Sequence, residues 1–114
     1  MGRASRRWRD LTKAAGVHLL ERDQPMRTVW KFALGTVEAR IEMPVGAEIV
    51  QFAAQGGRST LWAIVDSDAR RETRHFYLAG TGEAIPFEFN TYRGTCFNGP
   101  YVWHLFENTI PASN

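Results

Sequence analysis

Three histidines and one cysteine are the side chains here that most often bind metals or act as nucleophiles. His18, His75 and His104 are far apart in the sequence, and no pair has the spacing of metal ligands. Cys96 has no second cysteine with which to form a disulfide or a cysteine zinc site. We expect His75 and His104 to be hydrogen-bonded strand residues, and Cys96 to be a small buried side chain. These residues therefore predict no catalytic, metal or cofactor site.

Two short segments resemble ligand-binding loops but lack essential residues. The acidic residues of segment 66–72 lack the later Gly and bidentate Glu of a calcium loop, so we expect Asp66 to form an Asx turn instead. Gly80-Thr81-Gly82 lacks the third Gly and the Lys-Ser/Thr of a phosphate loop, which favours a tight turn. Three arginines beside the acidic residues predict a solvated, self-neutralised loop: Arg70, Arg71 and Arg74.

Apolar residues alternate with polar ones along much of the chain after residue 27, as is typical of β-strands. The runs 60–65 and 101–106 are apolar on both faces, which indicates strands covered on two sides. Turn residues separate the expected strands, at residues 28–34, 36–43, 48–54, 60–65, 73–79, 91–97 and 101–106. The sequence predicts an all-β fold, a small single-domain sandwich or partly open barrel of about seven strands.

Glycines and prolines indicate how these strands are connected. Gly35 predicts a tight reversal or bulge between the first two strands, and Gly56-Gly57 predicts a hairpin. Asn98-Gly99 is the strongest hairpin signal, and it predicts a type I′ turn in which both central residues have positive φ. Pro100 would then begin the last strand.

The strands carry more aromatic and aliphatic side chains than one sheet face needs. We expect a core of Trp30, Phe32, Ile41, Leu61, Ala63, Val65, Phe76, Leu78, Leu105 and Phe106. The other face would show Val29, Ile64, Tyr77, Phe97 and either Val102 or Phe106. Because monomers seldom expose so large an apolar patch, a second sheet or another chain must cover it. The candidate interaction residues of the domain are Tyr77, Phe97 and Tyr101.

The charge pattern divides the chain into a basic N-terminal extension (1–25), a β domain (26–108) and a short C-terminal tail (109–114). Residues 1–25 carry six basic and three acidic side chains (net +3), whereas residues 26–114 carry eight and nine (net −1). The extension includes a potential short amphipathic helix at 5–20, and we interpret it as a docking arm or as an extension particular to this protein. Its candidate interaction residues are Arg3, Arg6, Arg7, Trp8, Arg9 and Lys13.

Several segments of the domain together resemble a family of short phage and prophage proteins catalogued as a domain of unknown function. The segments are TVWKFAL, IEMPVGAEIV, LWAIVDSDARRETRHFYLAGTG, YRGTCF and VWHLFE, between about residues 26 and 107. The resemblance implies a compact β domain of phage or mobile-element origin, and it supplies no catalytic residues.

Our leading hypothesis is a non-enzymatic, phage-encoded binding protein, either a structural or accessory component or an inhibitor of a host factor. Its expected partner is another protein or a second copy of the chain, in the bacterial cytoplasm or in the virion. An alternative is a nucleic-acid-associated protein that uses the basic arm. A third is a small nucleotide-binding protein or enzyme with a pocket near residues 80–86 and His75 or His104. We expect no membrane span, because no apolar run approaches about 20 residues.

Overall fold

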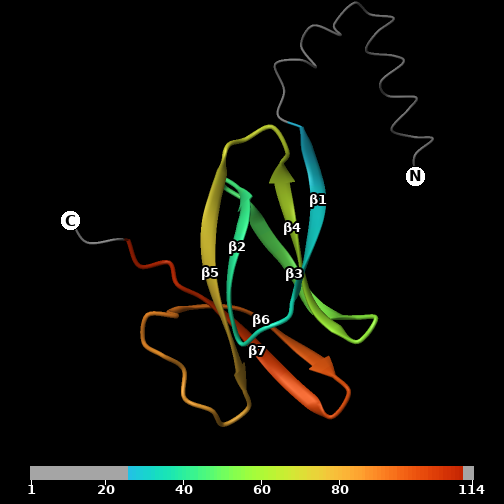
Figure 1. The fold of residues 1–114 in the computed structure, drawn as a ribbon, viewed down its shortest axis with the longest axis vertical. Helices are drawn as coiled ribbons and strands as arrows, with labels where there is room; N and C mark the ends of the chain where they lie inside the picture. The colour runs from blue at the N-terminus through green and yellow to red at the C-terminus, as the bar shows by residue number, and fades with distance from the viewer. Residues whose placement is uncertain (1–25, 112–114) are drawn as a thin grey trace, which may run out of the picture.

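The computed structural model describes residues 26–111, which form seven β-strands and no helix within that range (Figure 1). The strands are β1 (Arg27–Leu34), β2 (Glu38–Pro44), β3 (Glu48–Gln55), β4 (Arg58–Asp66), β5 (Arg71–Gly80), β6 (Thr91–Asn98) and β7 (Tyr101–Glu107). Each contains or overlaps one of the segments that the sequence predicts to be strands. The all-β prediction is therefore confirmed.

The seven strands form a sandwich of two antiparallel sheets. One sheet has the order β1-β4-β3 and the other has the order β2-β5-β7-β6. The chain crosses between the sheets after β1, after β2 and after β4. The expected reversal at Gly35 is therefore wrong, because β1 and β2 are not paired and the chain passes there from one sheet to the other. The β6–β7 hairpin and the 81–90 loop lie at the end of the molecule opposite the start of β1 (Figure 1).

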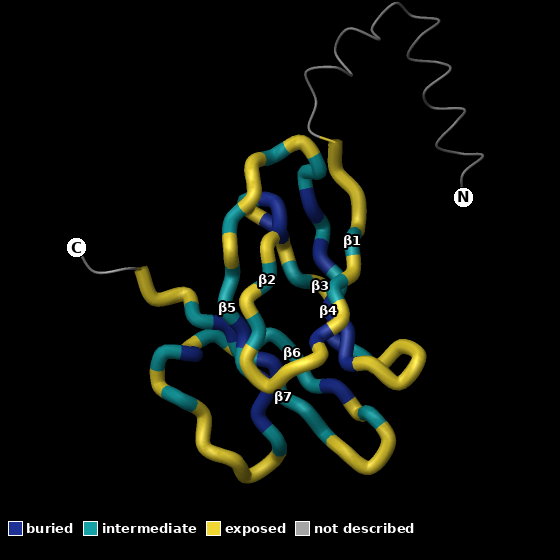
Figure 2. The backbone as a smooth tube through the Cα atoms, viewed as in Figure 1, coloured by how far each residue is buried: buried dark blue, intermediate teal, exposed yellow. Residues whose placement is uncertain are grey.

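The core lies between the two sheets and is built from the inward-facing positions of each strand (Figure 2). Most of the predicted core residues are fully buried there: Leu61, Ala63, Val65, Phe76, Leu78 and Leu105. Trp30, Phe32 and Ile41 are partly buried and pack against this cluster. Phe106 was expected in the core but is only half-buried, with its ring 5.5 Å from that of Tyr92. Strand alternation explains this, because Leu105 faces inward and its neighbour must face outward.

Each sheet is covered on its inner face by the other sheet, while its outer face is more open. The prediction that residues 60–65 and 101–106 are covered on both sides is therefore only half right. Trp62 and Ile64 on β4, and Val102 and His104 on β7, are half-buried rather than buried. Apolar residues on both faces of a strand thus indicate that the strand lies in the middle of its sheet, but not that both of its faces are buried.

Strand β6 lies close against the β3–β4 hairpin and joins the two sheets. Gly94 has φ +151°, and a Cβ on this residue would lie 3.1 Å from Cβ of Phe52. Further along β6, the Sγ of Cys96 lies 3.8 Å from the Ser59 hydroxyl. The Asn98 side-chain amide donates hydrogen bonds to the Gly57 carbonyl at 3.1 Å and to the Ser59 hydroxyl at 3.3 Å. Glycine at position 94 allows this approach, and the polar contacts hold the tip of the β6–β7 hairpin in place.

The predicted hairpins at residues 55–58 and around Asn98-Gly99 are both present, but the second has a different turn. Asn98 pairs with Tyr101, so the two loop residues are Gly99 and Pro100. Gly99 has φ +60°, and no non-glycine residue among 26–111 has positive φ. A glycine at the first central position is the pattern of a type II′ turn. The type I′ prediction is wrong because proline, which cannot adopt positive φ, occupies the second position.

Replacing Gly99 by Ala should lower the free energy of unfolding by about 1–2 kcal/mol, because a Cβ is strained at positive φ. Gly35→Ala is the matched control: Gly35 is not at positive φ, and its Cβ would meet no atom within 4 Å. Urea unfolding of both variants measures the difference. Equal stabilities would show that the turn does not require this backbone conformation.

Candidate functional site

The two histidines of the domain lie apart and are both engaged by neighbouring side chains. His75 Nε2 is 2.6 Å from the Glu38 carboxylate, and the ring of Phe89 packs edge-on against the imidazole with centroids 4.8 Å apart. His104 has Nε2 2.8 Å from the Thr81 hydroxyl and Nδ1 2.9 Å from the Thr95 hydroxyl. The prediction of hydrogen-bonded strand histidines is confirmed, and the two rings do not form a common site.

The other sequence motifs have the local structural roles expected of them. The Asp66 carboxylate accepts a hydrogen bond from the Asp68 amide at 3.0 Å, which is the predicted Asx turn. The Glu83 amide donates to the Gly80 carbonyl at 3.0 Å, so residues 80–83 form a turn. Cys96 is buried, as predicted. Among residues 26–111 no three His, Cys, Asp or Glu side chains gather as metal ligands. The same residues contain no helix that is long and apolar enough to cross a membrane.

The arginines near residue 70 do not form the self-neutralised loop that the sequence predicts. Arg74 points inward and forms a bidentate ion pair with Glu107, at 2.6 Å and 2.9 Å. Arg93 Nε donates to the same carboxylate at 2.9 Å, and Arg74 Nη1 donates to the Ala47 carbonyl at 2.6 Å. Arg71 lies with its guanidinium 5.1 Å from the Trp30 ring centroid. Sequence reasoning missed the Arg74–Glu107 pair because the partners are 33 residues apart and meet only across β5 and β7.

The Glu107 carboxylate is nearly inaccessible, with its side chain 4% exposed. Its hydrogen bonds raise the pKa of Arg74 above the ordinary arginine value, against the lowering effect of burial, with smaller contributions from the charges of Glu107 and Glu72. Arg74 therefore stays charged at neutral pH. The Glu107 carboxylate of β7 binds Arg74 of β5 and Arg93 of β6, and these charge-assisted hydrogen bonds hold the three strands together.

The residues expected to share the second sheet face are divided between two outer faces. Val29 pairs with Ile64 in the β1-β4-β3 sheet, while Phe97 pairs with Val102 in the other sheet. Tyr77 also belongs to the second sheet, but it is half-buried beneath Phe89, whose ring centroid lies 5.2 Å away. Tyr101 pairs with Asn98 and therefore lies on the opposite side of the hairpin from Phe97. The structure thus places Phe97 and Tyr101 near one hairpin tip, and Tyr77 under a loop.

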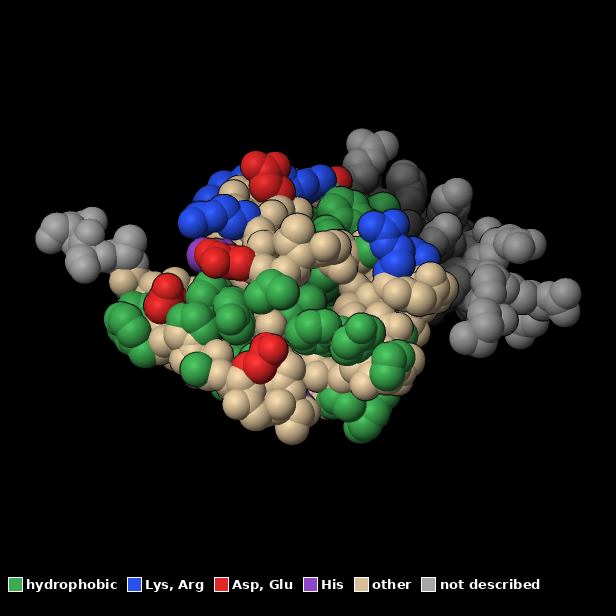
Figure 3. Space-filling model, turned by 60° about the horizontal axis from the view of Figure 1, so that its bottom comes forward, with side chains coloured by type: hydrophobic (Ala, Val, Ile, Leu, Met, Phe, Trp, Pro, Cys, Tyr) green, Lys and Arg blue, Asp and Glu red, His purple; other side chains and the backbone are tan. Residues whose placement is uncertain are grey.

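One end of the molecule collects exposed apolar side chains from two separate segments. We call it the aromatic end and define it by Ile85 and Phe87 of the 81–90 loop and by Phe97 and Tyr101 of the β6–β7 hairpin. Phe87 is 87% exposed, Phe97 75% and Tyr101 60%. Figure 3 shows hydrophobic side chains spread over this end, with isolated acidic side chains among them. Such a surface is typical of an interaction site.

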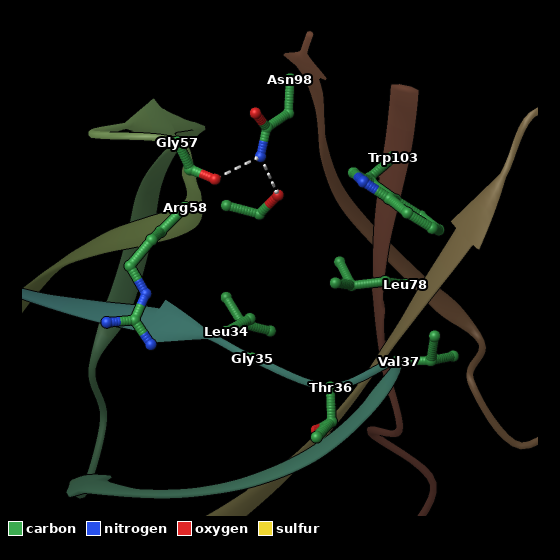
Figure 4. Close-up of a pocket in the computed structure, with 10 residues that line it drawn as sticks. Leu34, Gly35, Thr36, Val37, Gly57, Arg58, Leu78, Asn98 and Trp103 are labelled. Atoms are coloured by element: carbon green, nitrogen blue, oxygen red, sulfur yellow. Dashed lines mark hydrogen bonds between the residues drawn. The ribbon is translucent and has the colours of Figure 1, made fainter. Parts of the chain in front are cut away.

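Two hollows adjoin Trp103 at this end. The first, of about 340 Å³, has Leu34 and Leu78 between Arg58 on one side and Trp103 on the other (Figure 4). The second, of about 350 Å³, lies between the start of the 81–90 loop and the hairpin, and it includes Glu83 and Tyr101. The rings of Tyr101 and Trp103 are stacked, with centroids 5.9 Å apart and planes 24° from parallel. Together the hollows form a surface of mixed polar and apolar character, with one basic and one acidic side chain, Arg58 and Glu83, in their linings.

Sequence reasoning missed the contribution of the 81–90 loop. Ile85, Phe87 and Phe89 are large apolar residues in a segment expected to be a loop, and this composition was a usable signal for packing or interaction. Phe89 is buried against β5, whereas Phe87 remains outside. The interaction residues predicted in the N-terminal arm lie outside the described residues: Arg3, Arg6, Arg7, Trp8, Arg9 and Lys13. His18 lies outside them too.

Comparison with known proteins assigns the chain to a family. Residues 26–114 match the family model described as "Domain of unknown function (DUF7352)", which spans most of the chain. The protein therefore belongs to this family. No match was found among the curated proteins, and none among the solved structures.

Replacing Glu107 by Gln should lower the free energy of unfolding by about 3 kcal/mol, because it leaves Arg74 and Arg93 without their carboxylate. Arg93→Gln is the matched control and should cost less than about 1 kcal/mol, since that side chain is 30% exposed. The raised folded-state pKa of Arg74 means that its contribution is complete below the ordinary arginine pKa and is lost only at higher pH. The contribution of Arg74 to the free energy of unfolding should therefore stay constant through neutral pH. Urea unfolding at several pH values measures this contribution. Equal losses in both variants would contradict this role of Glu107.

Proposed function

We propose that this domain is a non-enzymatic protein-binding module that docks its partner on the aromatic end. The observation that carries the proposal is the exposure of Phe87, Phe97 and Tyr101 at one end of an otherwise well-packed sandwich. Exposed aromatic side chains contribute much of the binding energy in protein interfaces, because each buries a large area with few rotatable bonds. We infer that the partner is another protein or a second copy of the chain.

The way the hairpin is held supports this use of its side chains. Asn98, beside the turn, is hydrogen-bonded to Gly57 and Ser59 of the other sheet. The side chains of Phe97 and Tyr101 are therefore presented from a fixed backbone. A fixed backbone reduces the conformational entropy lost on binding, which favours affinity for a given contact area.

The enzymatic alternative has less support from the described residues. His75 and His104 do not line either hollow beside Trp103, and both contact neighbouring side chains. Residues 80–83 form a turn whose Gly80 amide donates to the Glu83 carboxylate at 2.7 Å. A carboxylate at this position disfavours a phosphate, which would need the same amide.

Phage or prophage origin is the remaining part of the proposal. It is supported by the resemblance of several segments, such as residues 61–82, to short phage proteins. A small domain that presents exposed aromatic side chains from a fixed backbone could serve as an accessory component of an assembly or as an inhibitor of a host factor. The nucleic-acid alternative depends on residues 1–25, since residues 26–114 carry more acidic than basic side chains.

Photo-crosslinking in bacterial cells that express the full chain tests the binding proposal. Replacing Tyr101 or Phe97 by p-benzoyl-phenylalanine should give a discrete covalent adduct with one protein, identified by mass spectrometry. The matched control places the same group at Val29, which is exposed on the outer face of the other sheet. An adduct of twice the chain mass would identify the partner as a second copy. The proposal would be contradicted if neither position 101 nor position 97 gave an adduct. It would also be contradicted if position 29 gave an adduct in equal yield.

A further inference from the structure

We propose that the two hollows beside Trp103 receive a proline-rich, extended segment of the partner, which carries an acidic residue toward Arg58 and a basic residue toward Glu83. The inference rests on the proposed function and specifies the chemistry of the partner. We define the Trp103 groove as both hollows together with the ring of Tyr101. Three independent properties of this groove favour such a segment: its stacked rings, its unused hydrogen-bond donor and the charges at its margins.

The stacked rings provide the surface on which a polyproline II helix packs. Tyr101 and Trp103 lie two positions apart on β7, so both project from the same side of the strand. Their centroids are 5.9 Å apart, and a polyproline II helix advances about 6 Å over two residues at about 3.1 Å per residue. Trp103 borders both hollows, which makes it the ridge between them. Aromatic-lined grooves are the usual receptors of such helices.

The hydrogen-bonding groups at the groove also suit a proline-rich backbone. Such a segment lacks amide hydrogens at proline, has no internal hydrogen bonds, and leaves its carbonyl oxygens free to accept. Figure 4 shows the indole nitrogen of Trp103 on the edge of the ring that faces the first hollow. Among residues 26–111, no side chain or carbonyl accepts a hydrogen bond from this nitrogen. Trp103 therefore offers a donor to a carbonyl of the bound segment.

The two charged side chains give the groove a direction. Arg58 borders the first hollow and Glu83 the second, so they lie on either side of the Trp103 ridge. Both residues are exposed, and neither has an ion-pair partner among the described residues. A segment with an acidic residue at one end and a basic residue at the other is complementary in one orientation only. Because these charges lie at the rim, they determine orientation and selectivity more than affinity.

The test uses the full chain and two synthetic probes, the peptides DPPLPPLPPK and KPPLPPLPPD, with DGSLGSLGSK as the flexible control. Fluorescence anisotropy should show saturable binding of a proline peptide, and ¹⁵N NMR should show that the Trp103 indole signal moves. Tyr101→Ala should weaken binding by about 10- to 30-fold. Tyr92→Ala is the matched control: Tyr92 is an exposed tyrosine of the same hairpin that lies outside both hollows, and its loss should change the affinity less than twofold.

A charge exchange tests the predicted direction. Arg58→Glu should weaken the peptide whose acidic residue faces Arg58, and replacing that residue by lysine in the peptide should restore the affinity. The proposal is overturned if neither proline peptide saturates, if the flexible peptide binds equally well, or if Tyr101→Ala has no effect. Binding of cellohexaose at the Trp103 signal, without peptide binding, would overturn it in favour of a saccharide site. A partner adduct at Tyr101 together with failure of both peptides would leave the protein-binding function standing and reject only the proline-rich partner.

Discussion

The close approach of β6 to the β3–β4 hairpin is the constraint on which the candidate site depends. Glycine at position 94 removes the side chain that would otherwise meet Phe52, and the contacts of Cys96 and Asn98 with Ser59 continue the same seam. The seam joins the edge strand β6 to the edge strand β3 and to the start of β4, so it helps to set the separation of the sheets there. It also fixes where the hairpin tip lies relative to Arg58. A wider separation would move Leu34 of the other sheet away from Trp103 and open the first hollow.

The side chains that stabilise the fold and the side chains available for binding lie at different positions along the strands. The inward positions of β4, β5 and β7 fill the core with fully buried side chains, and the Arg74–Glu107 pair ties β5 to β7 near the end of the core. Phe97 and Tyr101 lie near the tip of the β6–β7 hairpin and remain exposed. Their exposure is unfavourable in water by the ordinary hydrophobic effect, so a partner that covers them gains that free energy. The same hairpin is thus structural at its base and available for binding at its tip.

Most of the fold could be predicted from the sequence because strand alternation is local. Alternation, two runs that are apolar on both faces, and the turn residues between them identified all seven strands, and the Asx turn at Asp66 followed from one side chain and its neighbours. The assignment of strands to sheets could not be predicted in this way, because it depends on contacts between distant segments. For that reason Val29 and Tyr77 were placed on one face although they belong to different sheets. The candidate site was predicted in part, through Phe97 and Tyr101. Arg58 on β4, Glu83 in the 81–90 loop and Trp103 on β7 come from separate segments, so their roles follow only from the way the chain folds.

The central claim is that the aromatic end, and not the outer face of the β1-β4-β3 sheet, receives the partner. A structure of the domain in complex with the partner identified in cells tests this claim most directly. The account predicts that Tyr101 and Trp103 lose nearly all of their solvent exposure in the complex, while Val29 on the outer face of the β1-β4-β3 sheet stays exposed. A complex in which the partner covers Val29 and leaves Tyr101 in water would contradict the account.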